Sequence, residues 1–357
     1  MLAVCHLFDM LGVEETPRGE PWALLGGMAV FSIATSFLNK QVTAVCPDLF
    51  FVLLLQNGLG IIVALLVLPS WDKGWKPFRS LPREVYVKTF FLAWLFMAIL
   101  WTSLLGLGKG SVSLSVVAKS CLPLLVAILE PLCLPESNNR RVLFWVSLMA
   151  IVAVWLGSLD PTATYEVVLI FLLNLILAAA LSVIERMLVK SYTGVVSASQ
   201  LGTLRNAWSV PISLLFMLLL AEDTSVLVAS VTNVPALFWI GLSAVFANAL
   251  SLTGFVLKSL TTATTLAVVG TASKIISILM DTIWTIGQGG RSMPPELWVS
   301  MGLFSFFISM YAWETTKKAP HTGDPLPERT NASKGTAAAL VIGSCTYLAF
   351  ALSTLSG

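Results

Sequence analysis

Long runs of apolar residues constrain this chain more than any other feature of its sequence. Ten such runs, each long enough to cross a bilayer, are bounded by polar residues or by Gly and Pro: 21–45, 47–69, 85–107, 111–134, 141–159, 163–184, 197–220, 234–257, 261–287 and 297–314. A helix of about 20 apolar residues crosses a hydrocarbon core of roughly 30 Å. The sequence therefore predicts an all-α polytopic membrane protein with ten transmembrane helices in a lipid bilayer.

The composition excludes several other classes of protein. Only 11% of the residues are charged and 57% are hydrophobic, whereas a soluble domain carries about 25% charged residues. A soluble enzyme, a disordered protein and a nucleic-acid binder are therefore not expected. The five cysteines have no CxxC spacing and there are only two histidines, so neither a disulfide framework nor a metal site is predicted. We also expect no cofactor.

The ends of the chain differ from the ten runs. Residues 1–20 are predicted to be a cytosolic tail, without the pattern of a secretory signal or a transit peptide. Residues 317–335 hold three prolines and several charges and are predicted to be a flexible linker. The last segment, 336–357, is predicted to be an extra hydrophobic helix, and whether its apolar part, 336–356, spans the bilayer is left open.

Basic residues predict the orientation, because loops rich in Lys and Arg stay in the cytosol. With a cytosolic N-terminus, fourteen of the Lys and Arg residues in loops are cytosolic and only Lys109 and Arg291 are on the other side. The cytosolic set includes Arg186, which is predicted to lie in the loop after the sixth run. This asymmetry favours ten spans and a cytosolic N-terminus.

Five cations remain inside the runs: Lys40, Lys88, Lys119, Arg205 and Lys274. Lys88 is near a cytosolic helix end, where its side chain can snorkel to the membrane surface. For Lys40, snorkelling and a functional role are both open. The other three are deep, where a cation costs from roughly 2.5 to more than 10 kcal/mol. We expect them to face a polar cavity that receives an anion, since Arg offers a bidentate fork to phosphate and Lys a point charge.

Two segments five runs apart are similar. "SLSVVAKS" (113–120) and "TLAVVGTA" (265–272) are both rich in small residues, and when they are aligned the deep Lys119 and Lys274 fall one turn apart. This predicts two five-helix repeats, 21–160 and 161–316, of opposite topology. Inverted repeats with a midplane site are common in secondary transporters.

Four stretches resemble the nucleotide-sugar transporters of the drug/metabolite transporter superfamily, in the branch that includes the triose-phosphate translocators. They are "LNKQVTAVCPDLFFVLLLQN" (38–57), "AKSCLPLLVAILE" (118–130), "TLRNAWSVP" (203–211) and "TTATTLAVVGTASK" (261–274). The nearest pattern is that of the GDP-mannose transporters. The third stretch stands where those carriers have Phe-Tyr-Asn-Asn, and the fourth where they have Gly-Ala-Leu-Asn-Lys.

The resemblance implies a set of substrate-binding residues. Asn206 and Lys274 match the family motifs directly, Gly270 is the small residue that lets the ligand approach, and Ser273 replaces an Asn. Ser251 falls on a family serine that contacts the ligand. The deep cations Arg205 and Lys119 complete the set. The chain departs from the motifs where Leu204 and Arg205 replace Tyr-Asn, where Thr271-Ala272 replaces Ala-Leu, and where Leu266 replaces an aromatic residue. These departures weaken guanine recognition but leave phosphate recognition.

The resemblance implies an antiporter that exchanges a cytosolic nucleotide-sugar for a lumenal nucleoside monophosphate across the Golgi membrane. A GDP-sugar is favoured, and a UDP-sugar and an endoplasmic reticulum location remain open. The oligomeric state is also open, with a homodimer among the options. The alternatives are a plastid-type phosphate or triose-phosphate antiporter, and a non-transporting membrane protein. An enzyme is not expected, because a suitable pair of carboxylates is missing.

Overall fold

The computed structural model describes residues 22–46, 48–71, 76–110, 112–134, 140–158, 163–220 and 234–273, together with 299, 303, 306–308 and 310–311. Within these ranges every regular element is helical. The N-terminal tail, the linker and the last hydrophobic segment lie outside the described residues, as do Lys274 and most of the last two predicted spans.

The helices follow the apolar runs closely. Their bounds are α2 Trp22–Val45, α3 Leu49–Trp71, the short 3-10 helix η1 Phe78–Ser80, α4 Arg83–Lys109, α5 Val112–Ser120, α6 Leu122–Cys133, α7 Arg140–Ser158, α8 Tyr165–Ser191, α9 Ala198–Leu220 and α11 Val234–Leu260. A further apolar helix covers Ala263–Ser273.

Each of the first eight predicted spans coincides with one helix or, for 111–134, with the pair α5 and α6. Four of the described helices are long and apolar enough to cross a membrane: α3, α4, α8 and α11. Outward faces are also apolar: Leu218 and Leu219 at the end of α9 are each 69% exposed. The chain is thus an α-helical, multi-pass membrane protein, and the count of ten spans stays a prediction.

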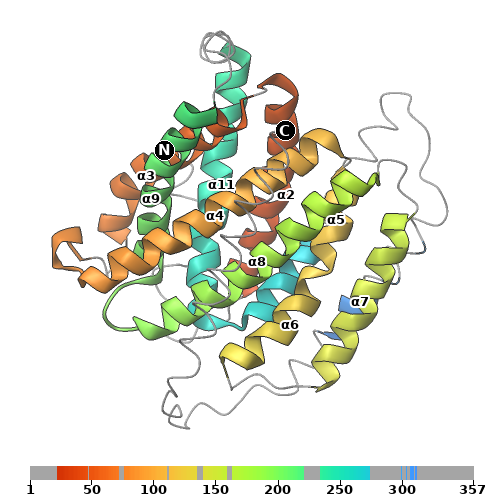
Figure 1. Ribbon diagram of the computed structural model, residues 1–357. Coiled ribbons are helices and arrows are strands. Elements are labelled where there is room, and N and C mark those ends of the chain that lie inside the picture. The colour runs from red at the N-terminus through yellow and green to blue at the C-terminus, as the bar shows by residue number, and fades with distance from the viewer. Residues whose placement is uncertain are drawn as a thin grey trace. The chain divides into compact units, whose positions relative to one another are not determined.

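The chain divides into two compact units, each made of two separate stretches. The first unit comprises Met1–Lys109 and Leu188–Thr262. In it α2 packs along α11, α3 packs against α9 and α11, and α4 packs against α9 (Figure 1). Its core is formed by fully buried residues such as Val52, Leu53 and Ile240, with a set of aromatic rings around Phe50 and Phe216.

The second unit comprises Gly110–Met187 and Ala263–Gly357. Here α5 and α6 pack against α7. One buried cluster joins Val117 of α5 to Met149 of α7 and Val268 of the helix Ala263–Ser273, so the two similar sequence segments lie in the same unit. The predicted repeats, 21–160 and 161–316, concern internal symmetry, which a division by compactness does not test.

Candidate functional site

Three predicted site residues of the first unit lie together. Arg205 on α9 is 3% exposed. Its Nε and Nη2 donate to Oδ1 of Asn206 at 3.3 and 2.9 Å, and Nη2 also donates to Oγ of Ser251 on α11 at 2.6 Å. The structure therefore brings a deep cation together with both of its predicted neighbours.

Two aromatic rings also lie close to this guanidinium. Its central carbon lies 3.5 Å from the ring centroid of Phe96 on α4 and 4.9 Å from that of Phe255 on α11. A cation near an aromatic face is attracted by the ring quadrupole, more strongly where water is excluded. The sequence analysis missed both rings, because an aromatic side chain inside an apolar run is indistinguishable from core.

The cluster continues through a chain of amides. Asn206 donates to Oδ1 of Asn248 on α11 at 3.0 Å, and Asn248 donates to the backbone carbonyl of Gly60 on α3 at 2.6 Å. Both asparagines are buried. Asn248 was also missed, although an amide in the middle of an apolar run is itself a signal, because burying it without hydrogen bonds is costly.

A second buried polar group joins α2, α3 and α11. The amide of Gln56 donates to Asn39 at 3.1 Å and to Ser243 at 2.8 Å, and the Ser243 hydroxyl donates to Asn39 at 2.7 Å. The pair Gln56-Asn57 begins seven residues after the start of α3, as Arg205-Asn206 does in α9. The two helices thus carry polar pairs at matching positions.

In the second unit, Lys119 stands beside a break in the fourth predicted span. The span is not one helix: α5 ends at Ser120 and α6 begins at Leu122. Pro123 explains the break, since it has no N–H to donate to the carbonyl four residues earlier, which is that of Lys119. The Lys119 residue is partly buried. Broken helices line binding sites in many transporters.

Gly270 and Ser273 lie on the helix Ala263–Ser273 in the same unit. Ser273 is 1% exposed and its hydroxyl donates to the carbonyl of Gly270 at 2.8 Å. A Cβ built on Gly270 meets no described atom within 4 Å, so this face of the helix has room. Lys274, the next residue along the chain, is outside the described residues.

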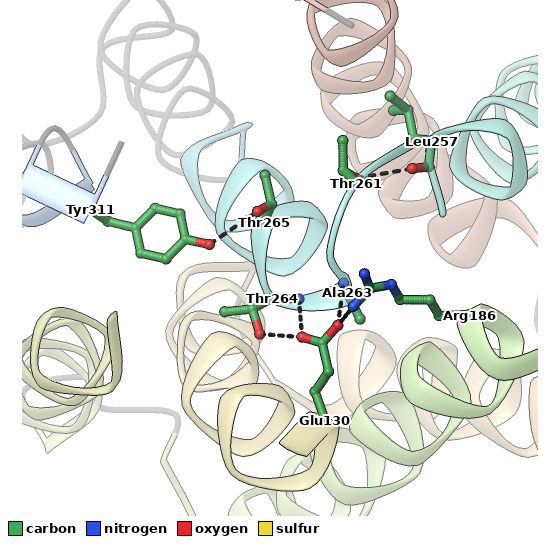
Figure 2. Close-up of polar contacts among 8 residues, drawn as sticks. All are labelled: Glu130, Arg186, Leu257, Thr261, Ala263, Thr264, Thr265 and Tyr311. Carbon is green, nitrogen blue, oxygen red and sulfur yellow. Dashed lines mark hydrogen bonds and ion pairs between the residues drawn. The ribbon is translucent and has the colours of Figure 1, made fainter. Parts of the chain in front are cut away.

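The start of this helix holds a buried ion pair that the sequence analysis did not predict. Glu130 on α6 pairs with Arg186 on α8, and its carboxylate also accepts hydrogen bonds from Ala263 and Thr264 (Figure 2). The assignment of Arg186 to a cytosolic loop is therefore wrong: α8 runs to Ser191, about two turns past the predicted end, and Arg186 is 6% exposed.

The predicted residues thus fall into two groups, one in each unit. Arg205, Asn206 and Ser251 form one cluster, while Lys119, Gly270 and Ser273 belong to the other unit. Among the residues that the structure describes, no group of three or more His, Cys, Asp or Glu side chains is placed to hold a metal. The first cluster can offer a fixed cationic fork, amides and a hydroxyl, which suits an oxygen-rich anion.

Comparison with known proteins defines the fold alone. No protein-family model and no curated protein matches the chain. A solved structure described only as "Crystal structure of protein" matches with a TM-score of 0.58 and 12% sequence identity, over 83% of this chain and 99% of the other. The chain has the same overall fold as that structure, which carries no information on ligand or activity.

Proposed function

We propose that this protein is an antiporter of the nucleotide-sugar transporter family, carrying a nucleotide-sugar across the Golgi membrane in exchange for a nucleoside monophosphate. The observation that supports it best is the buried cluster of Arg205, Asn206 and Ser251. The cost of a deep cation indicates Arg205 and the sequence resemblance indicates Asn206 and Ser251, and the three residues lie in contact inside apolar helices.

The geometry of Arg205 suits a phosphate ligand. Hydrogen bonds to Asn206 and Ser251 and the ring of Phe96 hold the planar guanidinium in one orientation. Nε and Nη2 already point in parallel at the Asn206 amide oxygen, so a phosphate that displaces this oxygen would receive two parallel bonds at little cost in entropy. The same arrangement would hold a neutral free sugar less well, because it lacks the charge that strengthens those bonds.

Exchange, rather than one-way passage, follows from the cost of burying cations. If the deep cations line the transport path, closing it empty seals positive charge away from water. A phosphorylated ligand offsets that cost, so the loaded protein reorients faster than the empty one. Export of one nucleotide then accompanies import of another.

In this proposal the second polar group, Gln56, Asn39 and Ser243, contacts the uncharged parts of the ligand. Gln56 and Ser243 supply amide and hydroxyl groups in the interior of the first unit. Leu266, where the GDP-mannose carriers have an aromatic residue, is 5% exposed. We favour a GDP-sugar over a UDP-sugar because the stretches 203–211 and 261–274 are nearest to that subgroup.

Counter-flow in proteoliposomes tests this function. Vesicles loaded with GMP, UMP, CMP or inorganic phosphate are presented with labelled GDP-, UDP- and CMP-sugars. We expect uptake of one nucleotide-sugar, driven by its own monophosphate, and loss of uptake in Arg205→Met but not in Arg83→Met, where the arginine is exposed. Phosphate-driven uptake of triose phosphate alone would favour the plastid-type antiporter, and no exchange of any kind would overturn transport.

A further inference from the structure

Glu130 is a fully buried acidic side chain of the second unit with several hydrogen bonds and an ion pair. It is 0% exposed. Its Oε1 accepts the backbone N–H of Ala263 at 3.0 Å, and its Oε2 accepts the N–H of Thr264 at 3.1 Å and the Thr264 hydroxyl at 2.6 Å. Arg186 supplies the counter-charge. Figure 2 shows all four groups converging on this one carboxylate.

The Glu130 carboxylate accepts hydrogen bonds from the first N–H groups of the helix Ala263–Ser273. Ala263 and Thr264 are the first two residues of the helix Ala263–Ser273, and the first N–H groups of any helix have no partner inside it. A residue just before the helix usually accepts them. Here a carboxylate from α6, 133 residues earlier in the chain, does so, and its charge is favourable at the positive end of the helix.

This contact orients more than the first turn. The carboxylate binds two successive N–H groups, one through each oxygen, which restrains both the position of the helix end and its rotation. Gly270 lies about 10 Å and Ser273 about 15 Å further along the helix axis, at 1.5 Å per residue. A short helix is stiff over that distance, so a shift at Ala263 is transmitted to both residues.

We propose that Glu130 is a positioning residue for the ligand site, acting through the start of the helix Ala263–Ser273. It sets the rotation of the helix and therefore the positions of Gly270 and Ser273 relative to the ligand, and Arg186 holds its carboxylate in place. This inference rests on the proposed function, because the ligand is taken to be a nucleotide phosphate at that helix.

The competing reading is that the ion pair only stabilises the packing of α6 and α8. The variants Glu130→Gln and Glu130→Gln/Arg186→Met separate the two. Gln keeps the shape of the side chain but replaces one acceptor oxygen with an NH2 donor. That donor cannot bond a helix N–H, and the Arg186 guanidinium loses its counter-charge. Arg186→Met then removes the unpaired guanidinium, whose burial without a counter-charge is the main cost to stability. Glu166→Gln, at an exposed position of α8, is the matched control.

Hydrogen exchange gives a reading that does not depend on transport. In the purified full-length protein we expect the amides of Ala263 and Thr264 to be protected in the wild type and in Glu166→Gln. Protection should fall at least tenfold in Glu130→Gln and should stay low in the double variant. Unchanged protection in Glu130→Gln would show that the carboxylate does not cap this helix and would overturn the inference.

Transport kinetics give the functional reading. We expect Glu130→Gln to raise KM for the nucleotide-sugar about tenfold and to lower the melting temperature. The double variant should recover the melting temperature and keep the raised KM. If it recovers both, the ion pair is structural only and the positioning role is overturned. Thr264→Val, which removes one hydroxyl bond and keeps the carboxylate, supplies a milder variant with an expected KM rise of about threefold should Glu130→Gln fail to fold.

The wild type distinguishes failure of this inference from failure of the proposed function. If the wild type exchanges no nucleotide-sugar, the proposed function and the ligand-positioning role fall together. If the wild type exchanges nucleotide-sugar and Glu130→Gln does so with unchanged KM, only the positioning role falls.

Discussion

The guanidinium of Arg205 on α9 donates a hydrogen bond of 2.6 Å to the hydroxyl of Ser251 on α11. Asn206, one residue later on α9, bonds Asn248, three residues earlier on α11, so the two helices run antiparallel. Arg205 is seven residues from the start of α9 and Ser251 nine from the end of α11. At 1.5 Å per residue both lie roughly 10–14 Å from the same end, which is well inside the helical bundle of the first unit.

Removing the Ser251 hydroxyl should weaken binding without unfolding the protein. In the proposed site the Ser251 hydroxyl also bonds the anionic ligand, and a hydrogen bond to a charged group contributes about 1.5–3 kcal/mol. Ser251→Ala should therefore raise KM for the nucleotide-sugar about tenfold or more while Vmax changes little. Ser259→Ala, on the exposed end of α11 where the hydroxyl only bonds the carbonyl of Val256, should transport like the wild type. Equal behaviour of the two variants would remove Ser251 from the site.

Charge alone should not replace Arg205. Arg205→Lys keeps the charge but loses the planar fork and the stacking on Phe96, so we expect a KM increase of at least tenfold. Arg205→Met removes the buried cation and should melt at or above the wild-type temperature while transporting nothing. A transporting Arg205→Met variant would show that this arginine is structural. Melting curves with and without added nucleotide separate binding from folding.

The contact of Gly60 with Asn248 predicts a paired substitution. A Cβ on Gly60 would lie 3.0 Å from Cγ of Asn248, whereas a Cβ on Gly58 meets nothing within 4 Å. Gly60→Ala must therefore push Asn248, and with it Asn206, whereas Gly58→Ala should be neutral or slightly stabilising because Ala favours the helix. We expect a lower melting temperature and a raised KM for the first variant only, measured side by side in detergent and in proteoliposomes.

Substitution of Gly270 tests whether the ligand, rather than the protein, occupies the space beside a glycine. Since a Cβ there has open space, Gly270→Ala should leave the melting temperature unchanged or raise it. If a ligand approaches this face closely, the added methyl group should still weaken nucleotide binding about tenfold. Gly26→Ala on α2, where a Cβ also has open space, is the control for the change in helix propensity. Normal transport by Gly270→Ala would show that the ligand does not reach this residue.

Cysteine labelling tests the predicted orientation. Single cysteines introduced near Arg79, Arg141 and Lys317 should react with an impermeant reagent from the cytosolic side. The structure places two of the predicted cytosolic segments together, because Lys76 after α3 bonds Gln200 and the carbonyl of Val195 near the start of α9. Labelling at Arg79 from the lumen would therefore contradict the charge-based orientation for both segments.

Hydropathy was sufficient to predict where most described helices lie, because the cost of leaving backbone groups unbonded in a bilayer forces each apolar run into a helix. Hydropathy alone did not predict the break before Leu122, because it counts Pro123 as part of the apolar run 111–134. The end of α8 was missed for a related reason. Glu185 and Arg186 look like a loop by composition, but Arg186 is buried in the structure because it pairs with Glu130.

The site was predictable only in part. A deep cation is conspicuous in sequence because its cost is large, which pointed to Arg205 and Lys119. Contacts between helices far apart in the chain leave no such signal. Glu130 lies in a predicted span, but its partners are Arg186 and residues 263–264, which are far from it in the sequence. Phe96 and Phe255 were hidden by their resemblance to core residues.

The interleaving of the two units has a consequence for biosynthesis. The first unit is built from Met1–Lys109 and Leu188–Thr262, so α2, α3 and α4 must wait for α9 and α11 while all of Gly110–Met187 is translated. At roughly 5–20 residues per second that delay lasts several seconds. Until α11 emerges, Gln56 lacks its bond to Ser243, and the Gly60 carbonyl lacks its bond to Asn248. The half-made unit therefore holds the Gln56 amide within the bilayer bonded to Asn39 but not yet to Ser243, and it is at this stage of synthesis that we expect the nascent chain to be recognised by membrane chaperones or by the degradation machinery.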